Sequence, residues 1–86
     1  MLTAERTTLP PATACPPRRS RASVLLYVRF GALDVRLGDR MAYLANGDQL
    51  AIPAGVEHSW RTPVDSSADI VVVTAELPLT STTLEV

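Results

Sequence analysis

The chain has 86 residues, a formal net charge of −1 and 47% hydrophobic residues. A chain of this length forms one small domain that buries about 60% of its unfolded surface, so association with a second copy is favoured. The balanced charge argues against a nucleic-acid partner, and no apolar run approaches the ~20 residues of a membrane-spanning helix.

Residues 1–21 contain two proline pairs, Pro10-Pro11 and Pro16-Pro17, among Thr, Ala and Arg. Each proline removes a backbone donor and restricts the preceding residue to extended geometry. We therefore expect no regular ladder or helix here, and assign residues 1–21 to a flexible arm, or to a strap that lies over another surface. Because this N-terminus also lacks the apolar core of a signal peptide, we expect a cytoplasmic, bacterial protein with no membrane partner.

Four reactive or charged side chains of this arm receive no functional assignment. Cys15 is the chain's one cysteine, which excludes an intrachain disulfide and leaves an incidental thiol as the expected state. Arg18, Arg19 and Arg21 could contact an anion or an acidic partner, but solvation is the expectation, because three charges on a flexible segment are usually solvated.

From residue 22 onward the pattern becomes that of β-strands separated by Gly and Pro turns. Gly31 is expected to separate the first two strands, and the second of these, residues 32–37, alternates strictly between apolar and polar positions. Residues 22–77 are thus expected to form one all-β, antiparallel sandwich or barrel, followed by a C-terminal tail at 78–86. The expected strands are 23–30, 32–37, 41–44, 49–52, 58–62 and 70–76.

The most specific stretch runs from Gly47 to His58. Asn46-Gly47 is typical of a tight hairpin turn, and Pro53 and Gly55 shape a second turn just before the chain's one histidine. A histidine directly after a rigid turn is held at a defined angle, as a ligand or a pocket-lining residue must be.

This spacing resembles the second motif of the cupin superfamily: Gly, five residues, Pro, one, Gly, two, His. The family ends the motif with Asn after three more residues, a position held by Thr62 here. The resemblance implies a small cupin-like β-barrel, or RmlC-like jelly roll, truncated at the N-terminus by nature or by a misassigned start. Cupins include enzymes, sugar binders, sensors and storage proteins, so the resemblance indicates the fold more than the function.

The family's first motif, two His, one Glu and a closing Gly, is degenerate or missing. Gly31 fits the closing glycine, which places Val24 at the Glu position. The two His positions fall at Arg18 and Ser20, or at Pro17 and Arg19 with the longer spacing. Val has no donor atom and Arg has no lone pair to give, so the resemblance leaves His58 as an incomplete metal site.

Strand alternation predicts which side chains face the interior. If His58 faces inward, so does Trp60, and by the family's pattern Val24, Leu33 and Leu50 also point there. The ligand-binding residues predicted in this apolar interior are His58, Trp60, Leu26, Val28, Val35 and Ile52. A filled core in which His58 bonds to a backbone carbonyl is the alternative.

Three functions remain open at this point. The first is a domain that binds or senses a small, largely apolar molecule, with no cofactor. The second is a metal-dependent enzyme of the dioxygenase or isomerase type that uses His58 and a divalent transition metal. The third is a structural dimerisation domain. A homodimer is expected in any case, since a barrel without its upstream strands leaves sheet edges unpaired.

Overall fold

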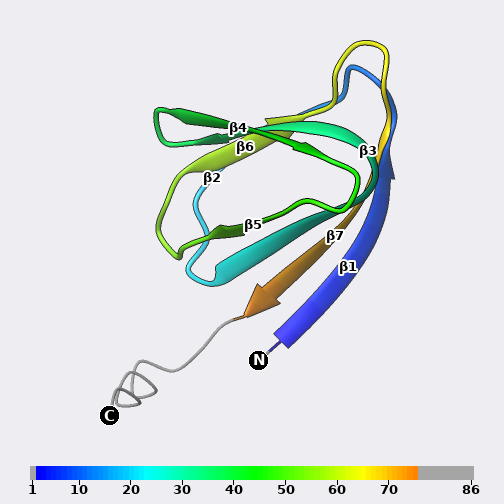
Figure 1. The fold of residues 1–86 in the computed structure, drawn as a ribbon. Helices are drawn as coiled ribbons and strands as arrows, with labels where there is room; N and C mark the ends of the chain where they lie inside the picture. Colours follow the sequence, from blue (N-terminus) through cyan, green and yellow to red (C-terminus); the bar gives the residue numbers. More distant parts are fainter. Residues whose placement is uncertain (1, 76–86) are drawn as a thin grey trace.

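The computed structural model describes residues 2–75, in which every regular element is a β-strand (Figure 1). The all-β, antiparallel class predicted from the sequence is therefore confirmed. The strands are β1 (Leu2–Leu9), β2 (Ala14–Arg18), β3 (Ser23–Leu37), β4 (Arg40–Ala45), β5 (Gln49–Ile52), β6 (His58–Arg61) and β7 (Ala68–Ala75). The predicted tail, 78–86, lies outside the described residues. Within residues 2–75 we find no helix that is long and apolar enough to cross a membrane.

The strands form two sheets that share β3. The first half of β3 pairs with β7 and β5, and β7 pairs in turn with β1; we call this the β1 sheet. The second half of β3 pairs with β4 and β6, and β6 pairs with β2; we call this the β2 sheet. Figure 1 shows β3 curving from one sheet into the other, so the two sheets enclose a common interior.

Gly31 lies where β3 passes between the sheets. Its φ is +96°, and the register with β7 shifts just before it, between Val28 and Phe30. A Cβ here would collide with the backbone of Ser67 and Ala68. The expected strand break at Gly31 is therefore a bend: the two predicted strands are one 15-residue strand that changes direction.

The turn at Asn46-Gly47 is hydrogen-bonded to this bend. The Gly31 N–H donates to Asn46 Oδ1 at 2.6 Å, and the Gly47 N–H donates to the Val28 carbonyl at 2.8 Å. Gly47 takes the positive φ, +84°, that the hairpin prediction assigned to this turn. β4 and β5 pair with different halves of β3 and not with each other, so the predicted hairpin is instead a turn that leads from one sheet to the other. This turn is tied directly to the point at which β3 changes sheet.

The expectation that residues 1–21 form no ladder is wrong. β1 pairs with β7 along its whole length, and β2 pairs with β6. The physical reason is where the prolines lie. Pro10-Pro11 occupies the connection between β1 and β2. Pro16-Pro17 lies in the edge strand β2, at the point between Cys15 and Arg18 where the pairing with β6 shifts its register. Edge strands and bulges are the places where a sheet tolerates proline.

An ion-pair cluster joins β1, β7 and β3. Arg6 Nη2 lies 3.0 Å from Asp69 Oδ2, and Arg29 Nη1 lies 3.2 Å from the same oxygen. The hydrogen bonds from Arg6 are the largest cause that holds the pKa of Asp69 below its ordinary value, and they raise the pKa of Arg6 in return. Asp69 therefore stays ionised in mildly acidic solution, and keeps its pairs with both arginines.

The interior is filled by apolar side chains from both halves of β3. The resemblance to cupins implied that Val24, Leu26 and Val28 share the interior with Leu33 and Val35, and all five are buried. They pack with Leu44, Ile52, Trp60, Ala68 and Ile70 into one core, while Leu50 is half-buried at its edge. The bend at Gly31 places the two halves of β3 on opposite walls of this core.

Thr62 holds the connection between β1 and β2 against the end of β6. Its side chain is 2% exposed; the hydroxyl donates to the Pro10 carbonyl at 2.6 Å and accepts from the Thr13 N–H at 2.8 Å. The backbone N–H of Thr62 also donates to the Thr13 carbonyl at 2.9 Å. The residue at the position where the family motif has Asn thus anchors the segment predicted to be an arm.

We expect Gly31→Ala to lower the free energy of unfolding by about 3 kcal/mol or more, because it combines a strained φ with a backbone collision. Gly47→Ala is the matched control: its φ is similar, but no atom lies within 4 Å of its added Cβ. The control should lose only about 1–2 kcal/mol. Urea unfolding of both variants measures the difference, and equal losses would contradict the role given to the bend.

We expect Thr62→Val to cost about 1–3 kcal/mol, because a side chain of the same shape leaves the Pro10 carbonyl and the Thr13 N–H without a partner. The exposed Thr8, on β1, provides the control substitution Thr8→Val. Amide hydrogen exchange should accelerate at Thr13 in the first variant and stay unchanged in the second. Unaltered protection of Thr13 in Thr62→Val would show that the hydroxyl does not anchor this turn.

Candidate functional site

His58 is fixed by the turn that precedes it. Gly55, with φ +85°, donates its N–H to the Ser20 carbonyl at 2.8 Å. The turn is thus attached to the segment that connects β2 with β3. His58 is 3% exposed, and its Nδ1 lies 3.0 Å from the Val56 carbonyl. A carbonyl only accepts, so Nδ1 carries a proton. In the neutral ring Nε2 then keeps its lone pair available.

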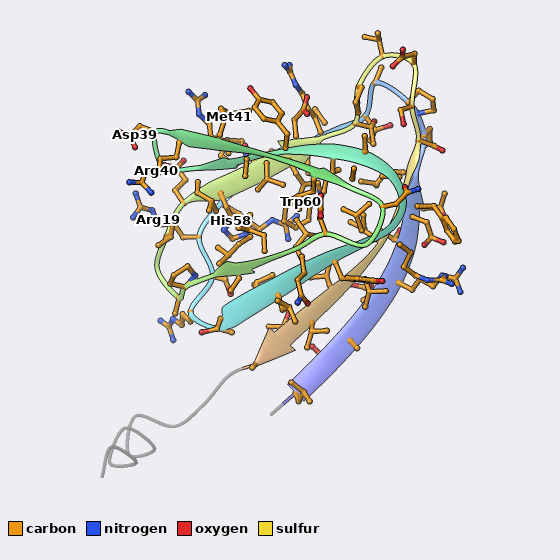
Figure 2. The ribbon with its side chains drawn as sticks, in the orientation of Figure 1. Arg19, Asp39, Arg40, Met41, His58 and Trp60 are labelled. Atoms are coloured by element: carbon orange, nitrogen blue, oxygen red, sulfur yellow. The ribbon has the colours of Figure 1, made fainter. Side chains whose placement is uncertain are left out.

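Trp60 lies two residues further along β6 and faces the same interior, as alternation predicted. Its ring stacks on His58 with centroids 5.8 Å apart and an angle of 19° between the planes (Figure 2). Trp60 is 9% exposed, and its Nε1–H is buried without a hydrogen-bond partner among the described residues. Buried indole N–H groups usually find a partner, so this donor is available to a bound molecule.

The other four predicted ligand-binding residues lie deeper in the interior than His58 and Trp60. Leu26, Val28, Val35 and Ile52 are at most 1% exposed and belong to the packed core. None of them lines either of the two cavities that Trp60 lines between the sheets. The structure thus brings His58 and Trp60 together, and puts the four aliphatic side chains behind them as support.

A cavity of about 380 Å³ lies beside His58 and Trp60. Val24, Val72 and Thr74 form its wall from the β1 sheet, and the segment from Arg18 to Arg21 forms its rim. A second cavity of about 210 Å³ adjoins it on the side of β1, with Trp60, Val72 and Arg18 lining both. The remaining lining of the second cavity is Glu5, Thr7, Leu9, Cys15 and Ile70.

Sequence reasoning missed Glu5, Cys15 and Arg18 as lining residues. Arg18 is the register partner of His58, and Cys15 is the register partner of Trp60, so both share a sheet face with these rings. Glu5 is the register partner of Val72 and faces the interior from β1. One signal was available: the family's first motif places a His at Arg18, which marks an inward position.

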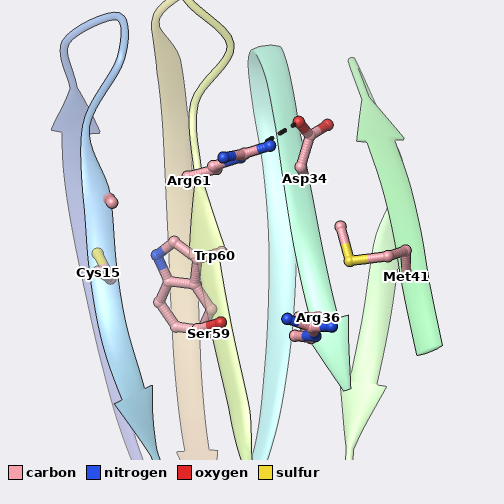
Figure 3. Close-up of a pocket in the computed structure, with 8 residues that line it drawn as sticks. Cys15, Asp34, Arg36, Met41, Ser59, Trp60 and Arg61 are labelled. Carbon is pink, nitrogen blue, oxygen red and sulfur yellow. Dashed lines mark ion pairs between the residues drawn. The ribbon is translucent and has the colours of Figure 1, made fainter. Parts of the chain in front are cut away.

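A further hollow, of about 260 Å³, lies across the β2 sheet and mostly involves outward-facing side chains (Figure 3). Arg61 and Asp34 face each other there, with the Arg61 Nε 4.0 Å from Asp34 Oδ2. Arg36, Ser59 and Met41 continue the same surface. Trp60 also lines this hollow, but His58, which stacks on the Trp60 ring, lines the interior cavity and not this hollow, so the interior is the stronger candidate site.

The donor atoms near His58 do not fit a transition-metal site of the family's kind. Among residues 2–75, no group of three or more His, Cys, Asp and Glu side chains is placed to hold a metal ion. Glu57, next to His58 in sequence, is exposed and lies 3.8 Å from Arg19 instead. Stable transition-metal sites need roughly three or four N, S or carboxylate donors, and His58 Nε2 supplies one.

We therefore expect protein prepared without chelator to contain no stoichiometric iron, manganese, zinc, nickel or copper. Elemental analysis by mass spectrometry measures this directly. The control is His58→Ala, which should give the same metal content as the parent protein. Near-stoichiometric metal that is lost in His58→Ala would establish a metal site and favour an enzyme.

Comparison with known proteins supports the same fold. The family model described as "Cupin domain" matches residues 5–74, and no curated protein matches the sequence. Among solved structures, TT1209 from Thermus thermophilus is 31% identical with a TM-score of 0.81, covering 90% of this chain and 74% of that one. The polyketide cyclase RemF from Streptomyces resistomycificus is 22% identical with a TM-score of 0.79, covering 88% and 55%.

The Cnp3 cupin domain from Schizosaccharomyces pombe is 12% identical, with a TM-score of 0.85, and covers 95% of this chain and 57% of that one. At 22% and 12% identity, RemF and Cnp3 bear on the fold alone. The chain spans just over half the length of these two structures. The match to the family model includes β2, the turn before His58 and most of β1 and β7. The chain thus belongs to the cupin family.

Proposed function

We propose that this cupin domain binds a small, largely apolar organic molecule in the cavity beside His58 and Trp60. The observation that carries the proposal is the buried Trp60 Nε1–H, which has no partner among the described residues and belongs to a side chain that lines that cavity. An unsatisfied buried donor costs about 1–3 kcal/mol, which a ligand that brings an acceptor recovers.

The cavity's shape and lining agree with this use. Its volume of about 380 Å³ falls in the ordinary range for small-ligand sites, which is about 300–1,000 Å³. Val24 and Val72 supply apolar contact, while Trp60 Nε1 and His58 Nε2 offer one donor and one acceptor. The apolar contact is confined to Val24, Trp60 and Val72, and the other lining residues, with Arg18 to Arg21 at the rim, are polar or charged. Polar groups that converge beside an apolar surface fix a ligand's orientation.

The competing functions have less support. A metal-dependent dioxygenase or isomerase requires donors beyond His58, and the described residues around it do not supply them. A purely structural domain gains nothing from a buried indole N–H without a partner, which only lowers stability. The filled-core alternative accounts for His58, whose Nδ1 meets the Val56 carbonyl, but not for Trp60.

The test uses the fact that the chain has a single tryptophan, so its indole N–H gives one resolved NMR signal. We expect benzyl alcohol, a flat apolar ring with one acceptor, to shift that signal saturably. The dissociation constant should lie in the millimolar range, which corresponds to a binding free energy of about −4 kcal/mol. Intermolecular NOEs should connect the ring to Trp60 and Val24. Trp60→Phe should weaken binding by roughly five- to tenfold, because it removes the donor and keeps an aromatic ring. Since this variant lacks the indole signal, its binding is measured from the Val24 amide signal, which is also followed in the parent protein.

The outer faces provide the internal control. Tyr43 and Leu25 are exposed away from the interior, and their amide signals should not move with the same saturation curve. Saturable shifts at Tyr43 or Leu25 with none at Trp60 would contradict the interior site. The same conclusion would follow if benzyl alcohol left the Trp60 signal unchanged to tens of millimolar.

A further inference from the structure

Arg18 brings a positive charge to the rim of the proposed site. It follows directly after the bulge in β2 and is the register partner of His58, so its backbone position belongs to the face that carries the imidazole. Arg18 is the one charged residue that lines both interior cavities. Its guanidinium can therefore reach a molecule that lies against Trp60.

The charges around this rim do not cancel. Arg19 lies 3.8 Å from Glu57 and also donates to the Gly55 carbonyl at 3.4 Å, so it is engaged at the turn before His58. Arg18 and Arg21 have no acidic partner within 4.0 Å among residues 2–75. Among residues 2–75, three arginines and no acidic residue line the 380 Å³ cavity.

Glu5 is the one acidic residue that lines the adjoining cavity, on the side of β1. It forms no ion pair with Arg18 in the structure, although both side chains line the same 210 Å³ space. Arg18 and Arg21 each contribute one positive charge and Glu5 contributes one negative charge, while the charge of Arg19 is balanced by Glu57. The two cavities therefore carry a net positive charge. An anionic group is attracted to the arginine side of this space, away from Glu5.

We propose that the ligand carries a carboxylate, bound by Arg18 at the rim, while its apolar body lies beside Trp60 and Val24. This inference rests on the proposed function, since it names the chemical class of the molecule held there. A planar guanidinium matches a carboxylate with two parallel hydrogen bonds, and such charge-assisted bonds are about twice as strong as neutral ones. The Trp60 Nε1–H adds a donor further in.

Three probes of the same shape test the charge preference: benzoate, benzyl alcohol and benzylamine. Each is titrated into the intact chain, and the Trp60 indole signal gives the dissociation constant. We expect benzoate to bind about tenfold more tightly than benzyl alcohol, and benzylamine to bind least well. The benzoate affinity should fall as sodium chloride rises, because the rim is exposed to solvent, whereas the benzyl alcohol affinity should not.

Arg18→Gln should remove the preference: benzoate affinity falls about tenfold, and benzyl alcohol affinity stays unchanged. Arg61→Gln is the matched control, because it removes the same charge from the outer face of β6 and leaves both cavities untouched. Glu5→Gln should strengthen benzoate binding a few-fold, since it removes the one negative charge in the adjoining cavity. Well-dispersed amide NMR spectra and unchanged urea unfolding midpoints in all three variants show that they remain folded.

The outcomes separate this inference from the proposed function. If benzyl alcohol and benzoate bind equally in the parent protein, or if Arg61→Gln and Arg18→Gln have equal effects, the carboxylate assignment is overturned and the apolar site stands. If no probe shifts the Trp60 signal, the interior takes no small aromatic molecule, and both proposals are wrong.

Discussion

The structure depends on one backbone constraint, the positive φ of Gly31 in the middle of β3. A side chain at this position would meet the carbonyl of Ser67, so only glycine lets the strand pass that close to the start of β7. Because β3 bends there rather than ends, its two halves can pair in different sheets. Val24, Leu26 and Val28 then face Leu33 and Val35 across one interior, and a single strand supplies half of the core.

Local sequence signals were enough to predict the extended segments of β3 to β7, but not that β3 continues through Gly31. The turns at Asn46-Gly47 and Pro53 to Gly55 are encoded within a few residues, and alternation correctly placed Leu33 and Val35 inside. The strand boundaries at β5 and the start of β6 follow from these turns. His58 and Trp60 were found for the same reason, since a rigid turn followed by alternation fixes both positions.

The first two strands could not be found in this way, because their partners are distant in sequence. β1 pairs with residues near the other end of the described chain, such as Leu9 with Ala68, and no local pattern within β1 indicates that pairing. In β2 the prolines argued against any strand, yet the edge position and the bulge accommodate them. Glu5, Cys15 and Arg18 were missed as site residues because they lie on the two strands that only long-range pairing creates.

The residues that stabilise the fold and the residues proposed to bind a ligand thus occupy different parts of the same interior. The four aliphatic side chains expected to contact a ligand are packed at the centre, where they hold the two sheets together. The polar atoms available for recognition lie at the side bounded by the edge strands β1 and β2. Changes of residue at this rim alter recognition with little loss of core packing, which suits a family with many functions.

The pairing of β1 with β7 also has a consequence for how the chain acquires its structure during synthesis. β1 is synthesised before the other strands of the described fold, and its partner is the last of them, with Leu2 opposite Ala75. At about 5–20 residues per second, β1 waits several seconds with its backbone groups bonded to water. Such non-local pairing is typical of proteins that fold in milliseconds to seconds. The wall that Val72 and Thr74 contribute beside Trp60 is therefore absent from the nascent chain, and the cavity comes into being only when β7 is released and closes the barrel.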